Sequence, residues 1–209
     1  MNGDIFRRDL MLHKFDGLNK DISTQINMLE NIIMLNSNLK KILIKSKELN
    51  ITDYYIGAGC IAQTVWNFLS DNPIDYGISD IDFVYFDLNL EESTENLMAQ
   101  RVNTLFSDIK IPIDVKNEAR VHLWYENHFG YKIEPYNSLE ESINSWPTTA
   151  TSIGLRIEED RLKVYAPFGL NDLFGGIVRA NKVQITEEIY NNKVNKWHNK
   201  WPNLTIIPW

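Results

Sequence analysis

Two aspartates, Asp80 and Asp82, stand two positions apart at the start of the apolar run Phe83–Phe86. Alternate residues of a β-strand project from the same face of a sheet, so a strand here places both carboxylates side by side. Two like charges in that position repel unless a cation lies between them, and a divalent metal ion is the usual solution. The alternative is structural, with Asp80 capping a turn and Asp82 on the solvent side of the strand. The pair predicts a metal site.

A glycine turn precedes this pair in the chain. Residues 53–56 favour a strand, Gly57 and Gly59 fall in the turn after it, and residues 60–70 favour a helix. A turn of this kind presents bare backbone N–H groups and the positive end of a helix dipole, and phosphate suits that position. The alternative is a tight turn without a ligand, because glycine is the usual residue where a positive φ is needed. Phosphate chemistry is therefore expected beside the carboxylates.

A glycine turn, a helix and an Asp-x-Asp strand in that order resemble the core signature of the polymerase-beta-like nucleotidyltransferases. That superfamily has a third carboxylate on a neighbouring strand, flanked by apolar residues, and Asp114 fits this position. Within the superfamily, the chain looks like a family of small bacterial nucleotidyltransferase-like proteins from about residue 29 to residue 181. The segments that carry this narrower likeness are residues 57–59, 79–82, 119–125, 146–151 and 166–174.

The resemblance implies an enzyme that moves a nucleoside monophosphate from an NTP to an acceptor hydroxyl and releases pyrophosphate. It implies that Asp80 and Asp82 bind two Mg²⁺ ions, with Mn²⁺ as an alternative. It also implies that Asp114 serves the ion that activates the acceptor hydroxyl. Magnesium prefers oxygen ligands, and two cations bridged by carboxylates neutralise a triphosphate and activate a hydroxyl. These three aspartates are the expected catalytic and metal-binding residues.

Six further residues are expected at the nucleotide. Gly57 and Gly59 would hold the β- and γ-phosphates, and Cys60 stands where the superfamily usually has glycine or serine. If the backbone N–H binds the phosphate, a cysteine there changes the affinity little. If a hydroxyl contact is needed, triphosphate binding is weaker. Two interpretations stay open for the remaining three residues. Ser79 either contacts a phosphate or caps the strand end, and Lys116 and Arg120 either neutralise the triphosphate or form salt bridges. The full set is Gly57, Gly59, Cys60, Ser79, Lys116 and Arg120.

The surrounding pattern predicts the elements that position these residues. Helical spacing or composition indicates helices over residues 24–35, 39–49, 60–70, 91–106, 119–128, 139–144, 170–178 and 187–201. A β-hairpin is expected over residues 152–165. Because strands and helices alternate, the expected fold class is α/β (α+β), a nucleotidyltransferase-like fold with a small mixed β-sheet flanked by helices. One domain over residues 1–209 is expected, with a loose N-terminal arm at 1–20 and a C-terminal extension at 182–209.

Composition limits the partners and the compartment. The net charge is −7, with 28 acidic residues against 21 basic ones, so a nucleic-acid acceptor is disfavoured against a small molecule or a protein. The chain has one cysteine and neither a signal-peptide pattern nor an apolar run of membrane-span length, which favours a cytoplasmic protein without a membrane partner. Two alternatives remain: a toxin-type transferase acting on tRNA, and a nucleotide-binding sensor without catalysis.

Overall fold

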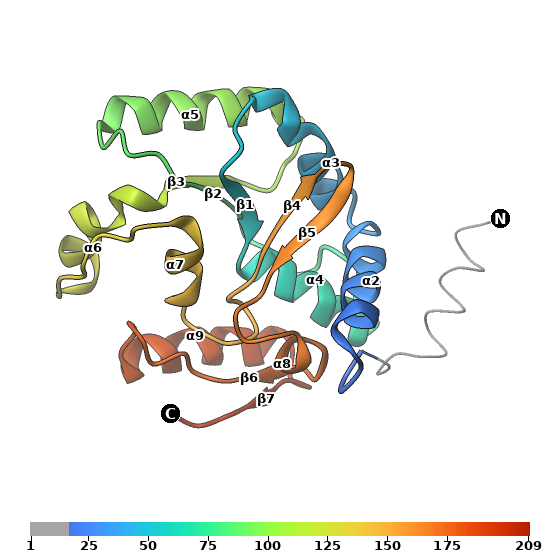
Figure 1. The fold of residues 1–209 in the computed structure, drawn as a ribbon. Helices are drawn as coiled ribbons and strands as arrows, with labels where there is room; N and C mark the ends of the chain where they lie inside the picture. The colour runs from blue at the N-terminus through green and yellow to red at the C-terminus, as the bar shows by residue number, and fades with distance from the viewer. Residues whose placement is uncertain (1–16) are drawn as a thin grey trace.

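The computed structural model describes residues 17–209, so most of the expected N-terminal arm lies outside the described residues. The α/β fold class is confirmed, because a mixed five-stranded sheet occupies the centre and helices surround it (Figure 1). Within residues 17–209, no helix is both long enough and apolar enough to cross a membrane.

The sheet brings together strands that are far apart in the chain. In sequence order the strands are β1 (Tyr54–Gly57), β2 (Ile81–Tyr85), β3 (Ile113–Asn117), β4 (Gly154–Glu158) and β5 (Arg161–Tyr165), and their spatial order is β3-β2-β1-β4-β5. Within this five-stranded sheet, only β2 and β3 are parallel to each other, and α5 (Glu92–Leu105) forms the crossover between them. β1 and β2 are therefore the central pair that carries the glycine turn and the Asp-x-Asp segment.

One face of the sheet is covered by α2 (Ile22–Ile33), α3 (Ser37–Lys45) and α4 (Gly59–Leu69). Asp21 caps α2 and Asn36 caps α3, each by accepting hydrogen bonds from backbone N–H groups of the first turn. The helix expected over 39–49 ends earlier and continues as a 3₁₀ turn, η1 (Ser46–Leu49). Apolar residues from these helices pack against alternate strand residues, which forms the main core.

The second face is covered less completely. Tyr55 and Val84 pack there against Leu139 and Ile143 of α7 (Leu139–Asn144). η2 (Glu118–Arg120) and α6 (Val121–Phe129) follow β3 on the same side of the molecule (Figure 1). Because side chains alternate along a strand, Gly57 shares the face of Tyr55, and Asp82 shares the face of Val84. Gly57 and Asp82 therefore lie on the more open face.

The C-terminal third differs from expectation at one helix. The helix expected over 170–178 is only α8 (Asn171–Phe174), and β6 (Ile177–Val178) follows it. Gly175 and Gly176 end the helix, and Gly176 has a φ of 60° that favours glycine. β6 pairs with β7 (Thr205–Ile206), a two-residue strand that no sequence pattern indicated.

The expected C-terminal extension packs on the main body of the fold. α9 (Glu187–Lys200) lies along the base of the molecule (Figure 1) and buries Tyr190 and Val194. Trp66 of α4 meets Trp197 and Trp201 edge to face, with ring centroids 5.6 and 5.7 Å apart. This aromatic contact fixes the C-terminal end of α4 and, through the rigid helix, the position of the glycine turn at its other end.

Candidate active site

The sheet places three expected site residues in one row across neighbouring strands. Gly57 of β1 pairs with Asp82 of β2, and Asp82 pairs with Asp114 of β3. Cross-strand partners project from the same face, so both carboxylates lie on the open face beside the glycine turn. Asp80 directly precedes β2, and its carboxylate accepts a 3.1 Å hydrogen bond from the Ser79 hydroxyl. The parallel pairing of β2 and β3 thus brings together carboxylates that are far apart in the sequence.

Asp82 experiences the strongest electrostatic stress in this row. Burial raises the pKa of Asp82 to about 7, and the nearby carboxylates of Asp80 and Asp114 contribute to that rise in that order. The ammonium groups of Lys193 and Lys116 oppose the rise in pKa. A carboxylate with these surroundings gains most from an added cation.

A fourth carboxylate, Glu118, was not among the expected residues. Burial raises the pKa of Glu118 to about 7; a hydrogen bond from Ser142 opposes the rise, and Asp82 and Asp114 add to it. The side chain is 6% exposed. Its position one residue after β3 was visible in the sequence, but its burial depends on α7 packing over it, which local pattern does not reveal.

The chemistry of these side chains fits a hard divalent cation, because all of them offer carboxylate oxygens. Their present placement does not complete such a site: among residues 17–209, no three acidic, histidine or cysteine side chains are grouped closely enough to hold a metal ion. The Lys116 ammonium lies 3.1 Å from Asp114 and supplies part of the neutralising charge. Asp80, Asp82 and Asp114 are the residues that would hold the cation.

The turn between β1 and α4 has its unusual backbone at Ala58. Ala58 has φ 56° and ψ −131°, a region that costs a non-glycine residue about 1–3 kcal/mol. Neither Gly57 nor Gly59 supplies the positive φ on which the alternative of a turn without a ligand rested. Gly57 is instead required by space, because a Cβ there would lie 2.7 Å from the Ile153 carbonyl oxygen and from the Trp146 ring.

Cys60 is a packed residue beneath the site. It is fully buried, and its thiol donates a 3.0 Å hydrogen bond to the Gly57 carbonyl oxygen. Burial raises the pKa of Cys60 well above its ordinary value, and the Asp82 charge adds to the rise. A thiol in this state is a poor nucleophile, so the side chain supports the turn and only its backbone N–H is available to a phosphate.

The two expected cations have different surroundings. Lys116 stays at the site beside Asp114, whereas the Arg120 guanidinium forms an ion pair with Glu95 and donates a 2.9 Å hydrogen bond to the Leu90 carbonyl oxygen. Arg120 is 8% exposed and ties η2 to α5, so it is placed as a structural residue. Lys193, an exposed residue of α9, is the cation that sequence reasoning missed.

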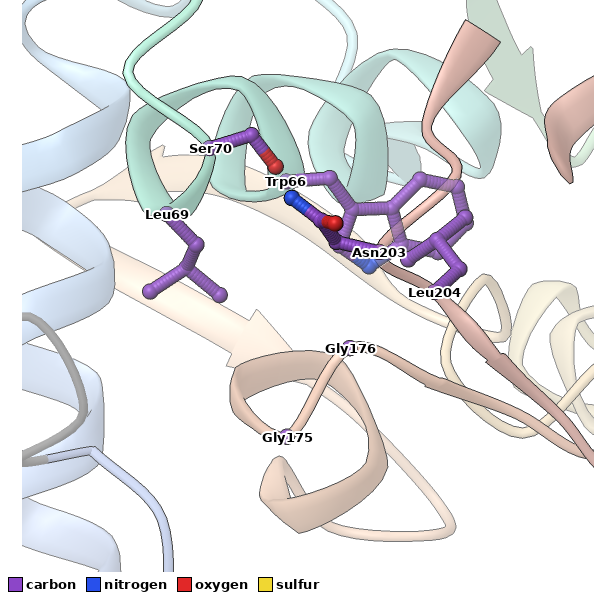
Figure 2. A pocket seen from close by; sticks show the side chains of 7 residues that line it. All are labelled: Trp66, Leu69, Ser70, Gly175, Gly176, Asn203 and Leu204. Carbon is purple, nitrogen blue, oxygen red and sulfur yellow. The ribbon is translucent and has the colours of Figure 1, made fainter. Parts of the chain in front are cut away.

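A cavity lies at the opposite end of α4, away from the carboxylates. It has a volume of about 170 Å³ and is lined by Trp66, Leu69, Ser70, Gly175, Gly176, Asn203 and Leu204. Figure 2 shows the α4 side chains on one side of this space and the turn that carries Gly175 and Gly176 on the other. None of the acidic site residues lines the cavity, so it has no part in the chemistry of the carboxylates.

Comparison with known proteins bears on the family and on the fold. The profile of a family described as nucleotidyltransferase matches residues 45–206. An NMR structure described as revealing a CCA-adding enzyme head domain superposes with a TM-score of 0.70 and 24% sequence identity, over 86% of this chain and 96% of that chain. At that identity the likeness shows the fold. No curated protein matches the chain.

Proposed function

The chain belongs to the nucleotidyltransferase family, and on that premise we propose that Asp80, Asp82 and Asp114 form a magnesium-dependent centre for transfer of a nucleoside monophosphate to an acceptor hydroxyl. The observation that carries the proposal is the row of Gly57, Asp82 and Asp114 across β1, β2 and β3. It puts two carboxylates on one face of the sheet, beside the turn that leads into α4.

Different residues of the chain would bind the triphosphate and supply positive charge. The N-terminus of α4 has no side-chain cap, so its first backbone N–H groups are available to the triphosphate. Lys116 and Lys193 supply positive charge on the carboxylate side. Bound Mg²⁺, or Mn²⁺ in its place, would neutralise the triphosphate and lower the pKa of the acceptor hydroxyl. Asp82, which is coupled to both other aspartates, would gain the most from that charge.

The proposed acceptor is a small molecule or a protein. A nucleic-acid acceptor needs several phosphates neutralised, and the chain carries 28 acidic residues against 21 basic ones. A tRNA acceptor stays the second candidate, because the structural neighbour is described as a CCA-adding enzyme head domain. A nucleotide sensor without catalysis is disfavoured, because all three carboxylate positions are filled.

The test is pyrophosphate release from each of the four NTPs with Mg²⁺ and candidate acceptors. Asp114→Asn should lose transfer, whereas Asp160→Asn, in the exposed β4–β5 turn, is the matched control and should keep it. Acceptor affinity should change only severalfold between about 50 and 200 mM KCl, because few phosphates are neutralised. Steeply salt-dependent use of tRNA would promote the second candidate, and nucleotide binding without any pyrophosphate release would promote the sensor.

A further inference from the structure

The cavity at the C-terminal end of α4 is lined by a residue whose polar group has no partner in the fold. Trp66 is 1% exposed, and its Nε1 has no hydrogen-bond partner among residues 17–209. The neighbouring indole of Trp201 differs, because its Nε1 donates a 2.6 Å hydrogen bond to Asn67 Oδ1. A buried N–H donor without an acceptor costs free energy, so the Trp66 indole calls for an acceptor atom.

The unpaired N–H is directed toward the cavity. Figure 2 shows the ring nitrogen of Trp66 on the side of the indole that is turned toward Asn203 and the turn of Gly175 and Gly176. Five buried side-chain atoms of residues 17–209 lack a hydrogen-bond partner, and only Trp66 Nε1 belongs to a residue that lines this cavity. The cavity and the unpaired donor are separate observations, and together they indicate an acceptor atom inside the cavity.

The lining limits the size and the charge of a ligand. The volume of about 170 Å³ is close to the roughly 150 Å³ that accommodates a benzene ring in an apolar protein cavity. No lining side chain is charged, so an ion buried there would lose its hydration without a counter-charge. Apolar surface comes from Leu69, Leu204 and the Trp66 ring, and Asn203 is exposed at the edge. These walls match a neutral molecule of one ring.

We propose that this cavity is a binding site for a small, neutral ring compound, whose carbonyl oxygen accepts a hydrogen bond from Trp66 Nε1. A carbonyl group pairs with the donor and adds no donor of its own that the apolar walls would leave unpaired. The inference goes beyond the proposed function, because none of Asp80, Asp82 and Asp114 lines the cavity. Water alone is the competing occupant, since buried water pairs with polar groups of this kind.

The experiment titrates the ¹⁵N-labelled full chain with cyclohexanone and with methylenecyclohexane, two rings of nearly equal shape of which only the first has an acceptor oxygen. Cyclohexanone should bind saturably and shift the indole N–H resonance of Trp66. Trp66→Phe keeps an aromatic ring and removes the donor, so it should weaken cyclohexanone by about tenfold relative to methylenecyclohexane. Trp124→Phe, at a partly exposed indole of α6 that does not line the cavity, is the matched control and should leave both affinities unchanged.

Each contrary result overturns the inference without touching the proposed function. Wild-type protein that does not bind cyclohexanone saturably would leave water as the occupant of the cavity. Equal losses of affinity for the two compounds in Trp66→Phe would show that the donor makes no contact with the carbonyl oxygen. If Trp66→Phe does not fold, the wild-type indole N–H resonance of Trp66 decides. A resonance that cyclohexanone leaves in place, or that methylenecyclohexane shifts equally, rejects the hydrogen bond.

Discussion

The two ends of α4 differ in the hydrogen bonds, backbone conformation and charges around them. At the C-terminal end, Asn67 donates hydrogen bonds to the carbonyl oxygens of Ile74 and Tyr76 and accepts one of 2.6 Å from Trp201 Nε1. At the N-terminal end, Ala58 occupies an unfavourable backbone region, Gln63 Oε1 is unpaired and Asp82 faces two other carboxylates.

The contrast separates the part of the helix that anchors it in the fold from the part that we propose lies beside the triphosphate. At the C-terminal end, the Asn67 hydrogen bonds and the edge-to-face indoles lower the free energy of the folded chain, although the buried Trp66 Nε1 there has no hydrogen-bond partner. Unpaired groups and like charges raise it at the other end, and a ligand is what would relieve them. Substitutions at the two ends should therefore move stability and activity separately.

The largest effect on stability is expected from Trp201→Ala. Removing this fully buried indole leaves a cavity and deprives Asn67 Oδ1 of its donor, so the free energy of unfolding should fall by about 3–5 kcal/mol. Nucleotidyl transfer per folded molecule should stay near the wild-type rate at low temperature. Urea denaturation and a rate corrected for the folded fraction check this, and a selective loss of transfer would remove the contrast between the two ends.

The next effect is the pH dependence of stability at Glu118. Its folded pKa of about 7 lies above the ordinary value of 4.5, so the folded chain holds a proton that the unfolded chain releases between these pH values. The free energy of unfolding should therefore fall as pH rises through this window, by roughly 3 kcal/mol for this group. Glu118→Gln should flatten that slope and stabilise the protein at about pH 8.

Denaturation across this pH range measures the Glu118 contribution, with Glu159→Gln in the exposed β4–β5 turn as control. Asp82 contributes a slope of the same sign, since burial raises its pKa as well, so some pH dependence should persist in Glu118→Gln. Equal slopes in the wild type and Glu118→Gln would show that burial does not raise the pKa of Glu118.

A smaller effect is expected from the cation of α9. Lys193→Ala should raise the KM for the NTP by up to about tenfold, because one charge near the triphosphate is lost at an exposed position, while stability stays nearly constant. Lys196→Ala, also exposed on α9, is the matched control and should change neither quantity. Indistinguishable kinetics for the two variants would remove Lys193 from the site.

The smallest effect is expected at the turn itself. Ala58→Gly relieves the cost of φ 56° but frees the unfolded chain, so the net stabilisation should be at most about 1 kcal/mol. The melting temperature measures it. A marked fall in melting temperature would show that Ala58 is not strained and that the N-terminal end of α4 resembles the other end more than proposed.

The sequence predicted what depends on short-range pattern. The glycine turn located the end of β1 and the apolar run after Asp82 located β2, whereas Asp114 and its strand were expected from the resemblance to the superfamily. The helix expected at 170–178 was wrong in extent, because two successive glycines, Gly175 and Gly176, outweigh the apolar rhythm.

Long-range pairing explains what sequence reasoning missed. Arg120 was expected at the nucleotide because it follows Asp114 closely, yet the fold places Glu95 of α5 against it. Lys193 was not among the expected residues, and only the packing of α9 brings its charge toward Asp82.

The most direct test of the central claim is the response of Asp82→Asn to Mg²⁺. Without metal, this substitution removes one of the mutually repelling carboxylates, so the variant should be as stable as the wild type or more stable. Added Mg²⁺ should raise the melting temperature of the wild type by mass action and leave that of the variant unchanged, and the variant should not transfer nucleotides. An Asp82→Asn protein that keeps full transfer or the full response to Mg²⁺ would contradict the account.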